Sequence, residues 1–373
     1  MRVLVFGATG DQGAAQIRRL RFHGHEPVAA VRETGQAQGP TKTRTARADY
    51  TEPETPARAI ESTRIDHTGP ETPAHTIESV HADYAKSETP AHTIESARID
   101  YTEPETPARA IESVHADYAE PETLARAVAA VRPDAVFLTL PSTSFQAAAP
   151  LIQAAEDIAR AAAQQPETRL LVFNASMVIQ HEPLGFAAHD ARHEMRRRIM
   201  AAAPAVSIAP VIYLDNLLRA WAAPSIREEG VIRYPHAETL DVSWITQEDV
   251  ADLMIAAMNR PALAGRSFTV GGPEAVRGPD LARRLGAAIG RRLQFDSEPV
   301  AAFAARMAGL FEGAASLERE RLASELARIY TWYNTAPERP FHVDMTPVLE
   351  ALPVTLTSIE TWARRWIPMR PTA

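Results

Sequence analysis

The glycine-rich segment GATGDQG, at residues 7–13, constrains the fold of this chain more than any other feature. The apolar run at residues 3–6 before it is typical of a short buried parallel strand, and residues 14–20 after it have a helical composition. In a strand–turn–helix unit, glycines at this spacing let the backbone approach a pyrophosphate, and the helix N-terminus offers unpaired N–H groups. The segment therefore predicts a dinucleotide-binding site. The alternative is a glycine-rich turn that only packs the helix on the strand.

The end of the second predicted strand, at residues 27–31, indicates which dinucleotide is bound. Arg32 and Glu33 follow this strand, at the place where such a fold contacts the adenosine ribose. A carboxylate there would bind the ribose hydroxyls of NAD, whereas a basic side chain would accept the 2′-phosphate of NADP. We favour Arg32 as the phosphate ligand, and so NADP(H), and NAD(H) stays open as the alternative.

Strand and helix patterns alternate through the first half of the chain. Apolar strand segments lie at 134–140, 169–174 and 206–209, with helical segments at 148–163 and 188–202 between them. This alternation predicts an α/β fold, a Rossmann-type doubly wound parallel sheet. We place the dinucleotide-binding domain at 1–212 and a smaller substrate lobe at 213–373. Within the lobe, 246–273 is expected to return to the sheet and 346–366 to form two helices broken at Pro353.

Residues 46–130 form five tandem units of 17 residues, each predicted to be a strand, a turn and a two-turn helix. A single unit cannot bury a core alone, so the units are expected either to stack at the sheet edge or to be loosely ordered. In the fifth unit Leu124 replaces a proline, and this unit is interpreted as the original pair of the fold. The four others are then an insertion, either without function or serving as an interaction surface. The equivalent aspartates are Asp49, Asp66, Asp83, Asp100 and Asp117.

Composition narrows the function classes. The net charge is −8 and no basic face is evident, so no nucleic-acid partner is expected. The chain has no cysteine and no apolar run of the roughly 18 residues that span a bilayer, and its first strand leaves no room for a signal peptide. We therefore expect a cytoplasmic protein without a membrane partner. His189 and His193 are four residues apart, with His181 nearby, but a third ligand is not evident and no metal is predicted.

Several segments together are similar to the NmrA-like family of atypical short-chain dehydrogenase/reductases. They are GATGDQG, AAVRE, ADYAEPETLARAVAA before DAVFLTLP, LVFNAS, IAPVIYLDNLL and QEDVADLMIAAMNRP. The resemblance implies NADP(H) bound by a Rossmann domain, with Arg32 at the 2′-phosphate and an aspartate, Asp117 or Asp49, beside the adenine. Arg192 stands where the wider superfamily has the lysine that holds the ribose. The other residues implied in the cofactor site are Gly7, Thr9, Gly10, Asp11, Gln12, Gly13, Leu140, Pro141, Asn174 and Pro210.

The chain departs from the Tyr-x-x-x-Lys pair of the wider superfamily, in which the tyrosine is the general acid. Ala188 stands at the tyrosine position and Arg192 at the lysine position. An arginine can hold ribose hydroxyls or a phosphate, but it stays charged and cannot exchange protons. Other candidates for the proton donor are Ser176, Tyr213, His189 or a bound water.

Three functions remain open at this point. The first is an NADP(H)-dependent oxidoreductase that reduces a small carbonyl, enone, quinone or imine substrate. The second is a non-catalytic NADP(H)-responsive regulator that binds a protein partner through the repeat or the C-terminal helices. The third is a non-redox biosynthetic enzyme on the same scaffold. A monomer and a homodimer are both compatible with the sequence.

Overall fold

The structure is a computed structural model, which describes residues 1–32, 111–143, 147–310 and 316–367. Its centre is a seven-stranded, fully parallel sheet in the order β3-β2-β1-β4-β5-β6-β8. β4 and β5 are buried along their whole length and read as continuous apolar runs, as expected for strands covered on both faces. The strands are β1 Arg2–Phe6, β2 Glu26–Val31, β3 Glu112–His115, β4 Ala135–Thr139, β5 Leu170–Asn174, β6 Ala205–Pro210 and β8 Ser267–Val270.

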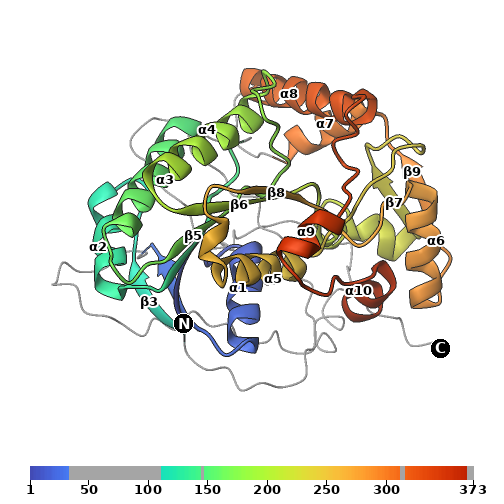
Figure 1. Cartoon of the computed structure of the whole chain (residues 1–373). Helices are drawn as coiled ribbons and strands as arrows, with labels where there is room; N and C mark the ends of the chain where they lie inside the picture. The colour runs from blue at the N-terminus through green and yellow to red at the C-terminus, as the bar shows by residue number, and fades with distance from the viewer. Residues whose placement is uncertain (33–110, 144–146, 311–315, 368–373) are drawn as a thin grey trace, which may run out of the picture.

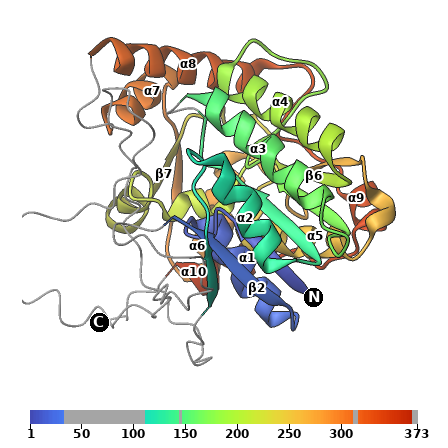
Figure 2. The same cartoon turned by 90° about the vertical axis from the view of Figure 1, so that its left-hand side faces the viewer.

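Helices cover both faces of this sheet (Figure 1). On one face α2, α3 and α4 pack side by side over one apolar core, as Figure 2 shows from the front. On the other face α1 and α5 pack together, and α9 adds apolar side chains to the second core. These helices are α1 Asp11–Phe22, α2 Pro121–Val131, α3 Ala148–Ala163, α4 Ala187–Ala202, α5 Gln247–Met258 and α9 Thr346–Ala351. The predicted doubly wound α/β fold is confirmed.

A third apolar cluster, formed by residues of the later chain, is rich in aromatic rings and lies beside the main sheet. It is built around a two-stranded parallel sheet of β7 Val231–Tyr234 and β9 Gln294–Ser297. The helices of this lobe are α6 Gly278–Ile289, α7 Val300–Gly309, α8 Ser316–Thr335 and α10 Ile359–Trp366, with the short helical turns η2 Leu214–Leu218 and η3 Ser225–Glu229. A further turn, η4 Pro261–Leu263, packs beside α5 on the main sheet. None of the described helices is long and apolar enough to cross a membrane.

The pairing of β3 places the fifth 17-residue unit in the sheet. β3 is hydrogen-bonded to β2, with Val28 opposite Glu112 and Val31 opposite His115. Leu124 is fully buried in the following helix α2, where the proline of the other units would stand. The first three units and most of the fourth lie within residues 33–110, outside the described residues, and the last two residues of the fourth unit, Glu112 and Ser113, form the start of β3. Asp117, two residues after β3, is therefore the repeat aspartate that lies beside the end of β2.

Candidate functional site

The strand order reverses between β1 and β4, and a ligand of a doubly wound sheet binds at the carboxyl edge beside such a switch point. The glycine turn follows β1 at this edge. Gly7 has φ +80°, and a Cβ built on it would lie 2.2 Å from the Thr139 carbonyl oxygen. A Cβ on Gly13 would lie 2.1 Å from the Gly7 carbonyl oxygen. Both glycines are thus required by packing within the protein.

Gly10 differs from these two glycines because the protein itself leaves room for a side chain there. A Cβ on Gly10 would meet only the Gly7 carbonyl oxygen, at 3.5 Å, which is an ordinary contact. Gly10 is exposed and is the N-cap residue of α1, where no side chain accepts a hydrogen bond from the first turn. An uncapped helix end behind an exposed glycine fits a pyrophosphate, which would accept the N–H hydrogen bonds.

A polar cluster lies at the same edge, formed by Gln12, Asn174, Ser176 and Tyr213. Gln12 Oε1 accepts hydrogen bonds from Asn174 Nδ2 at 2.8 Å, Ser176 Oγ at 2.9 Å and the Tyr213 hydroxyl at 2.9 Å. Three elements supply these side chains: the start of α1, the end of β5 and the segment after β6. Since three donors hold the oxygen of Gln12 inward, its Nε2 amide group remains to donate hydrogen bonds to a ligand.

The members of this polar cluster differ in what they can do chemically. Asn174 and Tyr213 are buried, whereas Gln12 and Ser176 are partly exposed and form the outer side of the cluster. Ser176 has φ +63°, an uncommon conformation for serine that concentrates at functional sites. Burial raises the pKa of the Tyr213 hydroxyl above its usual range. Tyr213 therefore stays protonated and donates a hydrogen bond near neutral pH.

Two predicted residues lie on the adenosine side of the edge. Arg32 directly follows β2 and is partly buried. Asp117 follows the neighbouring strand β3, and its Oδ1 accepts a hydrogen bond from the Ala119 amide at 2.9 Å. This aspartate therefore also stabilises the turn into α2. The alternative candidate, Asp49, lies outside the described residues.

Arg192 is turned toward the backbone of the predicted ribose-binding segment. Its Nη2 donates hydrogen bonds to the carbonyl oxygens of Leu140 and Pro141, at 3.0 and 2.6 Å. The side chain is buried on α4, and burial lowers the pKa of the guanidinium to about 10, so it remains charged. In this structure Arg192 thus fixes the backbone at Leu140 and Pro141. Pro210, the last residue of β6, is buried at the same edge of the sheet.

His189 lies in a different environment from the polar cluster. Its Nε2 is 2.7 Å from the Tyr333 hydroxyl, and its ring packs against Phe186 and Trp332. Burial lowers its pKa to about 4, so the imidazole is neutral near pH 7 and cannot serve as a cationic proton donor. Among the described residues no group of three or more His, Asp or Glu side chains is arranged to hold a metal ion.

Two carboxylates near this edge, the half-buried Asp215 and the buried Asp249, have structural partners. Asp215 Oδ2 accepts a hydrogen bond from the Gln247 amide at 2.9 Å, so it caps the first turn of α5 instead of its own turn η2. Asp249 binds the Thr357 amide and hydroxyl, at 3.0 and 2.7 Å, and fastens the segment before α10 to α5. Burial raises the pKa of each carboxyl to about 6. Both pairings join residues far apart in the sequence, which no local pattern indicates.

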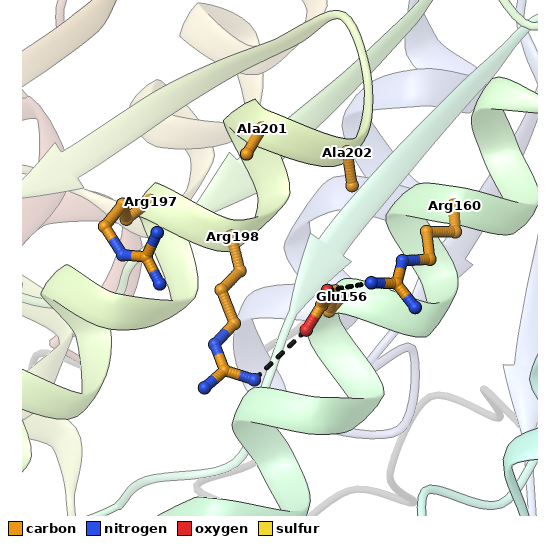
Figure 3. Close-up of a pocket in the computed structure, with 6 residues that line it drawn as sticks. All are labelled: Glu156, Arg160, Arg197, Arg198, Ala201 and Ala202. Carbon is orange, nitrogen blue, oxygen red and sulfur yellow. Dashed lines mark hydrogen bonds and ion pairs between the residues drawn. The ribbon is translucent and has the colours of Figure 1, made fainter.

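One surface hollow lies away from this site. It has a volume of about 300 Å³ and lies between α3 and α4 (Figure 3). Its lining residues come from the second halves of these helices, which point to the edge of the sheet opposite the glycine turn. It is lined by Glu156, Arg160, Arg197, Arg198, Ala201 and Ala202. Glu156 is paired with Arg160 and Arg198 across the hollow, which fits a solvated charged surface.

The sequence and the fold of this chain are similar to those of known proteins to different extents. The model of the NmrA-like family matches residues 102–363. An NAD(P)H azoreductase of Xenophilus azovorans is 34% identical over 88 residues, which are 24% of this chain, and the chain spans only 30% of that protein. The (4-alkanoyl-5-oxo-2,5-dihydrofuran-3-yl)methyl phosphate reductase of Streptomyces griseus subsp. griseus is 28% identical over 194 residues, which are 50% of this chain and 68% of that protein.

Among solved structures, the triphenylmethane reductase of Citrobacter sp. complexed with NADP(H) has a TM-score of 0.60 to this chain. The two are 14% identical, and the match covers 98% of this chain and 99% of the other. This likeness concerns the fold alone. The family model, in contrast, covers well over half of the sequence, from before β3 to within α10 of the lobe. The chain belongs to the NmrA-like family.

Proposed function

We propose that this protein binds NADP(H) across the glycine turn and reduces a conjugated acceptor such as an enone or a quinone. One observation carries the proposal: the polar cluster of Gln12, Asn174, Ser176 and Tyr213 lies directly behind a helix end suited to a pyrophosphate. The names of two relatives, an azoreductase and a dihydrofuranyl phosphate reductase, support a reductase of unsaturated acceptors.

The chemistry of the cluster favours conjugated acceptors over simple ketones. NADPH supplies a hydride when it is bound. Gln12 Nε2, on the exposed side, can donate a hydrogen bond to an acceptor oxygen or nitrogen that gains negative charge. Ser176 Oγ can donate there only by turning its one proton away from Gln12 Oε1. Neither group releases a proton near neutral pH, and Tyr213 is held protonated by burial. An enone or a quinone spreads the added charge over several atoms, so a solvent proton can complete the reduction. A simple ketone would need a strong acid at the reacting oxygen.

NADPH oxidation in the presence of a panel of acceptors tests this function. We expect turnover with enones or quinones and little with unconjugated ketones or imines. Tight NADPH binding without turnover on any class would contradict the reductase proposal and favour an NADP(H)-responsive regulator. In that case capture of a protein partner that depends on NADP(H) would be the next measurement.

Substituting Tyr213→Phe is expected to lower kcat/KM by about tenfold or less, because it removes only neutral hydrogen bonds, to Gln12 and Asn174. A general acid would cost about 10²–10⁴-fold when removed. The pH profile from about pH 6 to about pH 9 should show no ionisation that the variant abolishes, since the pKa of Tyr213 lies above that range. Steady-state kinetics of the unchanged protein and the variant on one acceptor measure both the change in kcat/KM and the pH profile. A loss of 10³-fold or more would make Tyr213 the proton donor.

Arg32→Ala is expected to weaken NADPH binding by about tenfold to a hundredfold and NADH binding by less than about threefold. The reason is that only NADPH carries the 2′-phosphate that a guanidinium at the end of β2 would pair with. Fluorescence titration of the reduced cofactors gives both dissociation constants. Equal weakening of the two would remove Arg32 from the phosphate role, and unchanged binding of both would place the adenosine end elsewhere.

A further inference from the structure

Asp11 places a negative charge where the proposed cofactor would bring its own. It is the first residue of α1 and follows Gly10, the exposed N-cap residue. A carboxylate here interacts favourably with the helix dipole, but it would repel a pyrophosphate bound at the same helix end. A protein that binds a dinucleotide at this turn therefore needs a cation close to Asp11.

Arg219 of the lobe supplies this cation. Its Nη1 forms an ion pair with Asp11 Oδ2, although the two residues are 208 positions apart in the chain. The side chains of Arg219 and Asp11 keep 25% and 38% of their exposure, so the pair lies at the surface and is partly open to solvent. No sequence pattern near Arg219 indicates this contact, because its partner is distant in the chain.

The backbone at Arg219 is fixed, which leaves the side chain as the part that can change partner. The Arg219 amide donates to the Asn216 carbonyl at 3.2 Å, and its own carbonyl accepts from Ala222 and Ala223 at 2.9 and 2.8 Å. These bonds anchor the residue at the end of η2, in the lobe. Partial burial lowers the pKa of the guanidinium, but it remains charged at neutral pH. A planar guanidinium matches the oxygens of a phosphate as well as those of a carboxylate.

We propose that Arg219 is a pyrophosphate ligand from the lobe, and that Asp11 holds its guanidinium in place until the cofactor binds. The proposal rests on the proposed NADP(H) binding and deepens it. In the free protein the Asp11 carboxylate occupies the position of an anion at the end of α1. With a dinucleotide bound, the guanidinium bridges Asp11 and a pyrophosphate oxygen, offsets the repulsion between them and joins the lobe to the glycine turn.

Cofactor titration of variants tests the proposal without any need for turnover. Arg219→Gln is expected to weaken NADPH and NADH equally, by about tenfold to a hundredfold, because both carry the pyrophosphate. Arg219→Lys should lose less, since it keeps a positive charge but not the forked geometry. Asp11→Asn should bind both cofactors as tightly as the unchanged protein or more tightly. Arg233→Gln is the control: Arg233 forms exposed ion pairs with Glu229 and Asp296, away from the glycine turn.

The outcomes separate this inference from the proposed function. Binding of both cofactors within about twofold in Arg219→Gln would overturn the role of Arg219. Selective loss of NADPH would also overturn it, because it would assign Arg219 to the 2′-phosphate. If Asp11→Asn weakened cofactor binding as much as Arg219→Gln does, the ion pair would serve only to hold the structure together. If the unchanged protein binds neither cofactor, the proposed function fails. Thermal unfolding of each variant without cofactor shows whether it is folded. If Arg219→Gln is unstable, the cofactor titration of Arg219→Lys is used instead.

Discussion

Gly13→Ala is expected to destabilise the protein by about 3 kcal/mol or more, and loss of soluble protein is within this expectation. A Cβ on Gly13 would lie 2.1 Å from the Gly7 carbonyl oxygen and 2.7 Å from the Ala8 Cα. Both neighbours are backbone atoms, and Ala8 is fully buried, so neither can move away as a flexible side chain could. The result would be a forced separation of α1 from β1 at the base of the glycine turn.

The free energy of unfolding in urea, followed by circular dichroism, measures this effect. The matched control is Gly309→Ala at the end of α7, where a Cβ would meet no atom within 4 Å. That substitution should be neutral or stabilising by up to about 1 kcal/mol, because alanine has fewer unfolded conformations to lose. Equal stability of the two variants would show that the turn at Gly13 is not closely packed.

The parts of the fold that follow local rules could be predicted from the sequence. The apolar runs gave β1, β4, β5 and β6, and the helix predicted at 148–163 coincides with α3. Pro353 indeed separates α9 from α10. Strand patterns and helix periodicity are properties of neighbouring residues, so they can be read from one segment at a time. The second strand of the lobe, β9, was not predicted, since QFDS is short and three of its four residues are polar.

The candidate site could be predicted only where a backbone motif determines it. The glycine turn and the edge of the sheet were placed by spacing, and Leu124, which differs from the proline of the other units, is fully buried in α2. The partners of Arg192, Asp215 and Arg219 could not be predicted, because each contact is set by the packing of elements distant in sequence. For the same reason the motif indicated a cofactor site better than it indicated the reaction.

Gly10→Ala should separate cofactor binding from folding. Gly10 has φ −83° and ψ 163°, which alanine adopts without strain, and its Cβ would make one ordinary contact at 3.5 Å. Stability should therefore stay within about 0.5 kcal/mol of the unchanged protein. The added methyl group would occupy the exposed surface on which a pyrophosphate packs, so NADPH and NADH should both bind about 100-fold more weakly.

Fluorescence titration of both reduced cofactors, together with urea unfolding, resolves the two effects in Gly10→Ala. The contrast with Gly13→Ala is the critical comparison, since the two glycines are one helical turn apart and differ in what surrounds the missing Cβ. A Gly10→Ala protein that folds and binds both cofactors normally would mean that the pyrophosphate does not pack at Gly10. The glycine turn would then serve only to pack α1 on β1, and both the NADP(H) site and the role of Arg219 would lose their basis.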